Sequence, residues 1–296
     1  MRLVPSLPGA APAINPSFQR QFNELRRQRR LRTLLGLGLF LLLFFAASII
    51  GKFSPAALIE GAPKLGDYIA RTLPVLRWDS LGADIGEWFY GIRKWLDLLL
   101  ETVLMAYLAT LLGSVGALGL CFYASRNLTP QVWAYHVARR VAEFFRTVPD
   151  LVFALIFVFA FGLGPLPGIL AMAIHSLGAN VKLFSEANEN IDMEPVEGLR
   201  SSGANWVQTM RFAVLPQVMP NYASYVLWRF EINVRTAAVM GFVGAGGIGM
   251  ELMTAVRSLY YEDISAILIL IVLTVTMIDL GCEKLRHWLI GRETFE

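Results

Sequence analysis

The chain has 296 residues, of which 55% are hydrophobic and 17% charged, and its mean hydropathy is +0.52. Several apolar runs reach the roughly 20 residues that cross a bilayer, so the composition excludes an ordinary soluble domain and predicts an all-α polytopic membrane protein. The formal net charge of +3 is too small to indicate a nucleic-acid partner.

The N-terminal segment, residues 1–32, is rich in proline at first and then becomes basic. Its arginines, at 26, 27, 29, 30 and 32, abut the first apolar run, residues 33–51. The positive-inside rule keeps this segment in the cytoplasm and makes the run the first transmembrane helix. The small residues at 46–48 leave a cleaved signal peptide as an alternative, but the basic region is long and the apolar run is nearly of span length.

Residues 52–97 mix both signs of charge with glycine, proline and aromatic residues, and we expect them to form an extracytoplasmic loop. The six basic residues of this loop are matched by acidic ones, so they oppose the orientation only weakly. Within the loop, Trp88, Phe89, Tyr90 and Trp95 predict a helix that lies at the outer membrane interface, because amphipathic rings prefer the headgroup level.

Residues 98–290 are predicted to form the transmembrane core, which brings the total to about six spans. Glycines at 113, 116 and 119 allow close helix approach, and Pro149 should kink the third span because proline lacks an amide donor. Cys121 and Cys282 lie in separate spans without metal-ligand spacing, so we expect small buried side chains and no metal site. An even number of spans places both termini in the cytoplasm.

On this topology, the polar stretch 193–216 is a cytoplasmic loop between the fourth and fifth spans. One helix is expected over residues 195–202, with Pro195 in its first turn. Gly203 should take a positive φ and turn the chain, and a second helix should follow until Pro216 ends it. A plain solvated connector is the alternative, but connectors rarely carry two helices around a glycine, followed by Leu-Pro.

The spacing within this loop is similar to that of the EAA loop of ABC importer permeases. The residues that carry the resemblance are Glu197, Gly198, Gly203, Ala204, Leu215 and Pro216. It implies that the loop docks as a coupling helix into a groove on an ATPase subunit. Gly198 departs from the family, which usually has alanine there. This lowers helix propensity by up to about 1 kcal/mol and leaves the spacing intact.

Two glycine-rich nucleotide-binding motifs bear on whether this chain binds ATP or a dinucleotide. The chain contains no GxxxxGK[ST], so it lacks the P-loop that cradles ATP phosphates. We therefore expect ATP and magnesium on a partner ATPase, with no cofactor and no catalysis in this chain. Gly244, Gly246, Gly247 and Gly249 satisfy GxGxxG, but the βαβ context of a dinucleotide site is missing. These glycines are expected to break the fifth span near the transport pathway.

Three charged residues lie inside the fifth span: Arg229, Glu231 and Arg235. A charge at the centre of a membrane helix costs roughly 2.5–3.5 kcal/mol on insertion scales, so such residues are usually paired or functional. Glu231 and Arg235 are four apart and are expected to pair along one helix face. Arg229 is then left to offer its planar fork to an anion. His175 in the fourth span is a further pathway candidate, although a lone buried histidine is more often a packing residue.

From about residue 98 to residue 289 the chain resembles the permeases of phosphonate ABC importers. The segments that carry the resemblance are GLGP at 162–165, IH at 174–175, PVEG at 195–198, LPQVMP at 215–220, RFE at 229–231, NVR at 233–235, and VGAGGIG at 243–249. The resemblance implies a type I importer permease fold in a bacterial inner membrane. It also implies a second copy of the permease, an ABC ATPase dimer and an extracytoplasmic phosphonate-binding protein, with phosphonate or a related phosphorus oxyanion as the solute.

The sequence is also compatible with three other functions. A permease for another small solute would share the same fold. A proton-coupled secondary transporter would use Glu231 as its relay, but it predicts internal repeats, which the sequence does not show. An intramembrane hydrolase built on His175 lacks a motif that pairs a nucleophile with a base.

Overall fold

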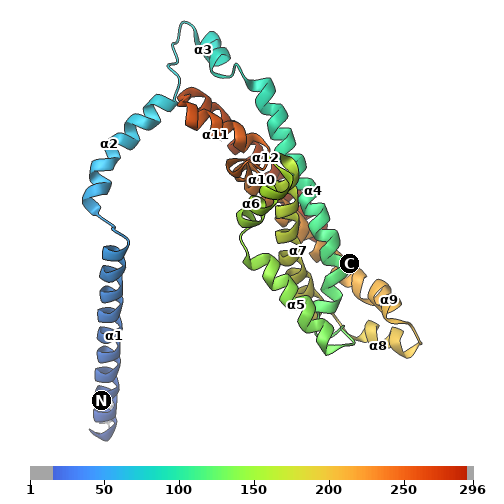
Figure 1. Cartoon of the computed structure of the whole chain (residues 1–296). Helices are drawn as coiled ribbons and strands as arrows, with labels where there is room; N and C mark the ends of the chain where they lie inside the picture. Colours follow the sequence, from blue (N-terminus) through green and yellow to red (C-terminus); the bar gives the residue numbers. More distant parts are fainter. Residues whose placement is uncertain (1–15, 292–296) are drawn as a thin grey trace, which may run out of the picture. The chain divides into compact units, whose positions relative to one another are not determined.

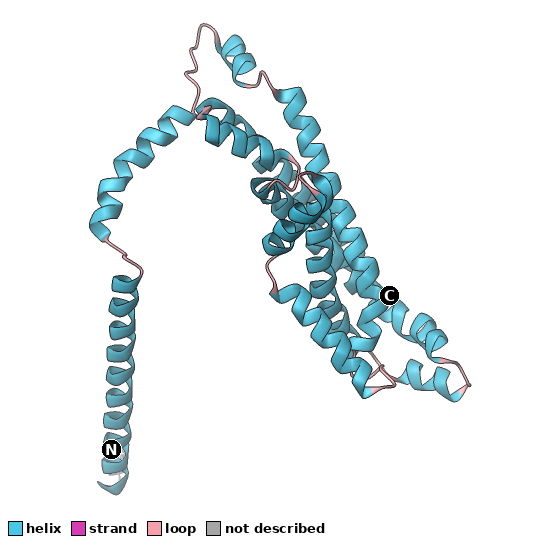
Figure 2. Cartoon of the chain, viewed as in Figure 1, coloured by secondary structure: helices cyan, strands magenta, loops and turns pink. Residues whose placement is uncertain are grey.

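The computed structural model of the protein describes residues 16–291, with side chains placed for residues 22–289. Within this range the chain is made of helices and loops (Figure 2). The helices are α1 (Pro16–Ile50), α2 (Pro55–Thr72), α3 (Leu81–Trp88), α4 (Ile92–Ala124), α5 (Val132–Thr147), α6 (Asp150–Phe161), α7 (Pro165–Glu189), α8 (Glu194–Ser201), α9 (Trp206–Thr209), α10 (Leu215–Met240), α11 (Ile248–Ser258) and α12 (Tyr261–Gly291).

The chain divides into two compact units, residues 1–68 and residues 69–296. In the first unit, the basic segment and the first predicted span form one continuous helix, α1, and its part from Phe22 to Ile50 contains an apolar stretch long enough to cross a membrane. Residues 1–15 of the predicted basic segment lie outside the described residues. The second unit contains all the remaining predicted spans.

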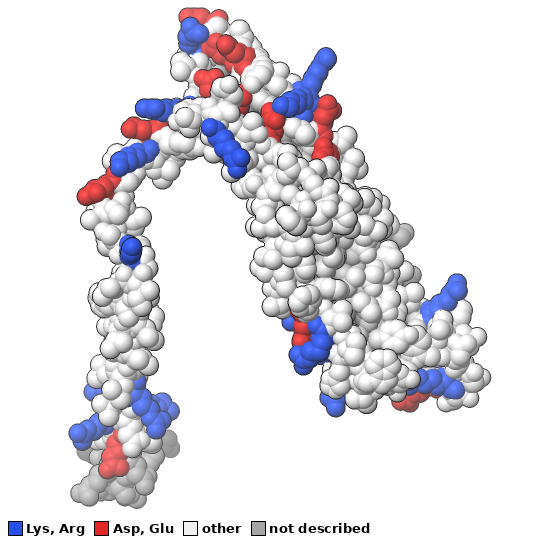
Figure 3. All heavy atoms as spheres, in the orientation of Figure 1, with Lys and Arg blue, Asp and Glu red and all other residues white. Residues whose placement is uncertain are grey.

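Four helices of the described chain are long and apolar enough to cross a membrane, and the number rises to six if each of two bent helix pairs is one span. One bent pair is α5 with α6, which meet at 84° around Pro149, the residue predicted to kink the third span. The other pair joins Trp206–Val243 to α11 at 46° across the glycine-rich break. In the second unit, Figure 3 shows the charged side chains gathered at the two ends, with an uncharged band of surface between them.

The core of the second unit is built around α4 and α7, which pack side by side (Figure 1). Gly113 of α4 lies against α7, because a Cβ atom there would stand 2.7 Å from both the Ala173 carbonyl oxygen and Ser176 Cβ. Gly178 of α7 lies against α5 in the same way, because a Cβ atom there would stand 2.6 Å from the Ala142 carbonyl oxygen. Glycines therefore let three helices approach more closely than a methyl group would permit.

Replacing Gly113 by alanine should lower the free energy of unfolding by about 1–3 kcal/mol, because the added methyl group overpacks the α4–α7 interface. Gly119 lies in the same helix, but a Cβ atom there meets nothing within 4 Å. Gly119→Ala is the matched control and should be neutral or slightly stabilising. The free energy of unfolding of both variants is measured in detergent micelles. Equal changes in the two variants would contradict the close packing of α4 on α7.

The predicted interfacial aromatic residues belong to different elements. Trp95 lies in α4 and is only 2% exposed. Trp88 ends α3, and its indole Nε1 donates to the Glu262 carbonyl oxygen and to Ser265 Oγ at the start of α12. Tyr90 donates its hydroxyl to Asp263 at 2.9 Å. These aromatic residues were predicted to share one membrane-facing helix. In the structure, Trp88 and Tyr90 instead tie α3 and the turn after it to α12, and Trp95 lies in the core.

The hydrogen bond to Asp263 raises the pKa of the Tyr90 phenol above its ordinary value of 10.0, because ionisation would break the bond beside a carboxylate. A raised pKa stabilises the fold below pH 10 and loses this contribution as the pH rises through the folded-state pKa. In Asp263→Asn the phenol should titrate closer to 10.0. Phenolate absorbance, taken as the difference from Tyr90→Phe in each background, measures the shift, and an unchanged titration would refute the interaction.

Candidate functional site

Between α7 and α10 the chain forms a helical hairpin, the α8–α9 hairpin (residues 194–214), at one end of the second unit (Figure 1). α8 ends in a Schellman motif, in which the Ala204 amide donates to the Leu199 carbonyl and the Gly203 amide to the Arg200 carbonyl. Gly203 has φ = 85°, as predicted from the sequence. Asn205 then caps α9 through a reciprocal capping box with Gln208. The turn is therefore defined by backbone geometry on both sides.

Pro216 does not end the second helix, and this prediction was wrong. A π turn, Met210–Val214, leads directly into α10, and Pro216 lies in the first turn of that helix. The Leu215 amide bonds to the Met210 carbonyl, five residues back. This shift of the hydrogen bonds by one residue accommodates the proline ring and its missing donor, so the chain passes into α10 without a break.

Hydrogen bonds hold the hairpin and the helices that flank it. Tyr222 of α10 donates to Asn188 Oδ1 of α7 at 2.6 Å, and Asn188 Nδ2 donates to Ser125 Oγ just after α4 at 3.0 Å. At the tip side, the Trp206 indole donates to the Leu128 carbonyl at 3.0 Å. The hairpin is therefore tied to the segment after α4, and α7 and α10 are tied to each other and to that segment, since polar atoms in a buried network are costly to leave unpaired.

The outer face of the hairpin is exposed and chemically mixed. Glu197, Gly198 and Gly203 are all exposed, whereas Ala204 and Leu215 are half-buried. Two large apolar side chains stand out beside them: Val207 is 65% exposed and Phe212 is 62% exposed. Large apolar side chains left exposed on a hairpin that also exposes charged residues are typical of a surface that another protein covers.

Arg229 is buried, with 7% of its surface exposed, and it lies in a polar cluster between α4, α7 and α10. Its Nε donates to Ser176 Oγ at 3.0 Å. Asn233, one turn further along α10, donates to Ser176 Oγ and to Thr110 Oγ1 at 2.9 and 2.8 Å. Among the described residues no carboxylate lies within 4.0 Å of Arg229, and no hydrogen bond from its two terminal nitrogens is found. The cluster therefore presents a buried cation whose planar fork is uncommitted.

His175 lies next to this cluster and faces the kink between α5 and α6. Its Nδ1 is 3.3 Å from the Val148 carbonyl oxygen, which Pro149 leaves at the break in the helix. Asp150, at the start of α6, is close enough for its charge to act on both His175 and Arg229. The histidine thus has a hydrogen-bond partner, in agreement with the packing role that the sequence favoured.

The predicted side-chain pair between Glu231 and Arg235 is wrong. Glu231 pairs instead with Arg286 of α12. Arg235 donates to the Glu231 main-chain carbonyl at 3.2 Å and lies 3.8 Å from Asp279 of α12. The charges of Glu231 and Arg235 are therefore balanced across the α10–α12 interface, whereas Arg229 is not part of it.

The glycine-rich break lies at the opposite end of α10 from the hairpin. Gly244, Gly246 and Gly247 all have positive φ. The Gly244 carbonyl accepts from the Gly164 amide at 3.0 Å, and the amides of Gly247 and Ile248 donate to the side chains of Glu101 and Thr102 on α4. The glycines thus break the fifth span, as predicted, and neighbouring helices satisfy the freed backbone groups.

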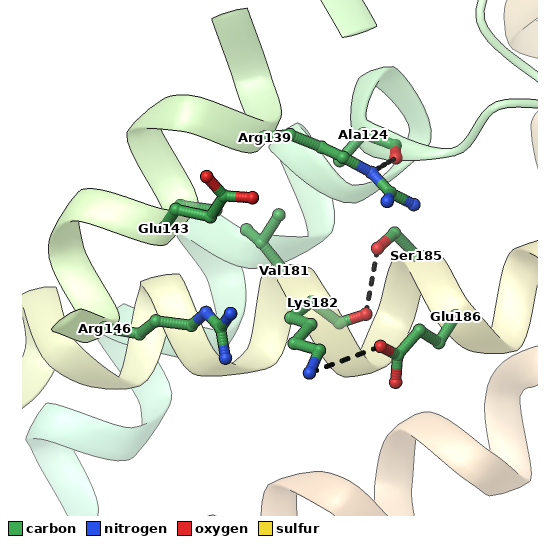
Figure 4. A pocket seen from close by; sticks show the side chains of 9 residues that line it. Ala124, Arg139, Glu143, Arg146, Val181, Lys182, Ser185 and Glu186 are labelled. Atoms are coloured by element: carbon green, nitrogen blue, oxygen red, sulfur yellow. Dashed lines mark hydrogen bonds and ion pairs between the residues drawn. The ribbon is translucent and has the colours of Figure 1, made fainter. Parts of the chain in front are cut away.

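A charged pocket opens between α5 and α7 on the hairpin side of the Arg229 cluster (Figure 4). Arg139 donates to the Ala124 carbonyl and pairs with Glu189 at 2.7 Å, and Lys182 pairs with Glu186 at 3.5 Å. Arg146 lines the same pocket. The predicted residues occupy four places: the hairpin, the level of Arg229 and His175, the α10–α12 interface with Glu231 and Arg235, and the glycine-rich break.

Residues 109–282, more than half of the chain, match the family described as "Binding-protein-dependent transport system inner membrane component". This chain belongs to that family. The permease is 37% identical to the phosphite transport system permease protein PtxC of Stutzerimonas stutzeri over 83% of this chain and 86% of PtxC. It is 39% identical to the phosphate-import permease protein PhnE of Mycolicibacterium smegmatis over 80% of this chain, although only 42% of that protein is covered.

A shorter relative has a higher identity over the part of this chain that it covers. The permease is 48% identical to the putative cryptic phosphonate transport system permease protein PhnE2 of Escherichia coli K12, over 41% of this chain and 100% of PhnE2. These relatives are permeases of phosphite, phosphate or phosphonate transport systems.

Solved structures agree with the predicted type I ABC importer permease fold. The inward-facing MetNI methionine ABC transporter matches with a TM-score of 0.55 at 21% identity, covering 66% of this chain and 95% of that chain. A bacterial transporter that imports the acidic polysaccharide alginate matches with a TM-score of 0.55 at 13% identity, covering 90% and 98%. The permease is therefore a multi-pass inner membrane protein of an ABC importer. Such importers work with an ATPase and a substrate-binding protein.

Sequence reasoning missed the residues that surround Arg229. Thr110, Ser176 and Asn233 come from three different helices, and only Asn233 lay in a segment that the sequence singled out. Their polarity inside apolar spans was the available signal, because buried polar groups need partners. Which of them meet depends on how the helices pack, which a single sequence does not show.

Proposed function

We propose that the permease carries a small phosphorus oxyanion across the inner membrane and that Arg229 binds the anion on its way. The observation that carries the proposal is the uncommitted guanidinium of Arg229, buried without a carboxylate within 4.0 Å among the described residues. A phosphoryl group offers two coplanar oxygens at the spacing of this fork. The transport systems named for the relatives, phosphite, phosphate and phosphonate, all handle such groups.

The neighbouring polar atoms suit the same ligand. Ser176 Oγ, Asn233 and Thr110 Oγ1 form one hydrogen-bonded cluster beside Arg229, so the arginine is held in place through its Nε while its terminal nitrogens stay available. A positioned cation of this kind attracts an anion without large rearrangement. Asp150 nearby limits the net positive charge, which helps the anion to leave again.

Energy is supplied by other subunits. We propose that the α8–α9 hairpin docks on an ABC ATPase and that two copies of the permease form the pore, with both termini in the cytoplasm. ATP and magnesium then bind to the ATPase, and the permease itself catalyses no reaction. Closure of the ATPase dimer would move the hairpin, and the bonds from Tyr222 and Trp206 would carry this motion to α4, α7 and α10.

The substrate is tested by reconstituting the permease with its ATPase and binding protein in proteoliposomes. ATP-dependent uptake of labelled phosphite, methylphosphonate and phosphate is compared with that of glycine betaine, a solute without a phosphoryl group. The proposal expects uptake of at least one phosphorus oxyanion and none of the betaine. Uptake of betaine alone would refute it.

Replacing Gly203 by leucine should uncouple the permease from its ATPase. At φ = 85° a side chain is strained by about 1–2 kcal/mol, which lowers the population of the correct turn by a factor of roughly 5–30. Co-purification with the ATPase and uptake should both fall, while the membrane-inserted amount stays unchanged. Gly198→Ala is the matched control, because this position is helical and a Cβ atom there meets nothing within 4 Å. Normal coupling in Gly203→Leu would show that the hairpin is not the docking site.

A further inference from the structure

The helix α2 divides its side chains into two opposite stripes. Leu58, Ala62, Leu65 and Ile69 follow one another at intervals of four, three and four residues, which places them on one face of the helix. The charged residues repeat with the same intervals two positions later: Glu60, Lys64, Asp67 and Arg71. At 100° per residue the two stripes point in opposite directions.

The apolar stripe is large and exposed. Leu58, Leu65 and Ile69 are 61%, 60% and 51% exposed, and from residue 58 to residue 69 the stripe extends about 17 Å along the helix. Leaving this much apolar surface in water is unfavourable, so it needs a cover. The opposite stripe contains two acids and two bases and has no net charge, so charge does not choose the partner.

The chain itself places α2 at a membrane surface. The apolar part of α1 ends at Ile50, and α2 begins at Pro55. Four intervening residues reach at most about 14 Å when fully extended. They are in fact folded into a turn, with the Phe53 amide bonded to the Ser48 carbonyl and Ser54 Oγ accepting from the Ala57 amide. A helix that starts this close to the end of a span begins in the headgroup region.

We propose that α2 lies in the membrane interface on the side where α1 leaves the bilayer, with its apolar stripe in the lipid and its charged stripe in water. This is the arrangement of an interfacial amphipathic helix, for which the apolar area supplies the binding energy. The occupant of the apolar face is the lipid of that leaflet. On this proposal the interfacial helix of the loop is α2, about 25 residues before the aromatic cluster around Trp88 from which the sequence predicted one.

The test uses the full-length permease in lipid nanodiscs, with single spin labels on cysteines introduced at Leu58, Leu65 and Ile69 or at Glu60, Lys64 and Asp67. Native Cys121 and Cys282 are buried, so the unmodified protein serves as the labelling blank. Collision rates with oxygen, which concentrates in lipid, are compared with those of a water-soluble nickel chelate. The ratio of oxygen to nickel collisions should be several-fold higher for every label of the apolar stripe than for every label of the charged stripe.

Three results would overturn the proposal. Equally low ratios on both stripes would show that the helix stands in water, and equally high ratios would show that it is immersed in lipid. Exclusion of both reagents from residues 58, 65 and 69 would show that protein covers the stripe. A second experiment tests whether the apolar stripe is what holds the helix in the lipid. Ile69→Asp should lower the ratio of oxygen to nickel collisions at a label on position 58 several-fold. The matched variant on the charged stripe, Arg71→Asp, should leave this ratio unchanged.

Discussion

Replacing Arg229 by glutamine should abolish oxyanion uptake while the permease remains inserted and bound to its ATPase. The two terminal nitrogens of Arg229 are the donors proposed to hold the anion. Charge-assisted hydrogen bonds contribute about 1.5–3 kcal/mol each, so the loss of two weakens anion binding by roughly 10²–10⁴-fold. Uptake by reconstituted proteoliposomes measures the effect. Normal uptake by Arg229→Gln would remove Arg229 from the pathway.

The conservative variant separates binding from structural support. Lysine at 229 keeps the charge but cannot reproduce the fork, so Arg229→Lys should transport with a raised KM for the anion. If Arg229 served only to position Ser176, glutamine could still donate to Ser176, and uptake would fall only in proportion to the amount of folded protein. Ser176→Ala is the matched test of that alternative: it removes the Nε acceptor and should reduce uptake less than Arg229→Gln does.

Local sequence rules predicted the features of this fold that depend on neighbouring residues in the chain. Gly203 was expected to turn the chain because only glycine readily takes a positive φ, and the structure has that turn. Pro149 was expected to kink the third span, and α5 and α6 meet there at 84°. Both effects follow from the backbone of a few consecutive residues, which the sequence displays directly.

Features that depend on helix packing were harder to predict. Trp95 was assigned to a membrane interface and lies in the core, because its helix face meets α11 and α12. The partner of Glu231 was assigned by spacing within one helix, but Arg286 is 55 residues away and reaches Glu231 only because α12 packs on α10. For Pro216, the signal for a helix end was outweighed by a π turn that accommodates the ring. In each case the deciding contact lies outside the local window.

Neutralising Glu231 alone should destabilise the permease by about 3–5 kcal/mol, because Arg286 would be left as an uncompensated charge within the protein. Arg286→Gln should do the same to Glu231, whose side chain is 10% exposed. The double variant Glu231→Gln/Arg286→Gln removes both charges and should be more stable than either single variant. Unfolding in detergent micelles, analysed as a double-mutant cycle, gives the coupling between the two residues.

Arg235 provides the control for this cycle, since it has the spacing that first indicated a pair. Its side chain is 52% exposed and lies 3.8 Å from Asp279, so Arg235→Gln should cost at most about 1 kcal/mol. Combining Arg235→Gln with Glu231→Gln should give additive effects, because the side chains do not pair. The opposite result would be that Arg235→Gln restores the stability of Glu231→Gln and Arg286→Gln does not. The charge on Glu231 would then be balanced by Arg235 within α10, and not by Arg286 of α12.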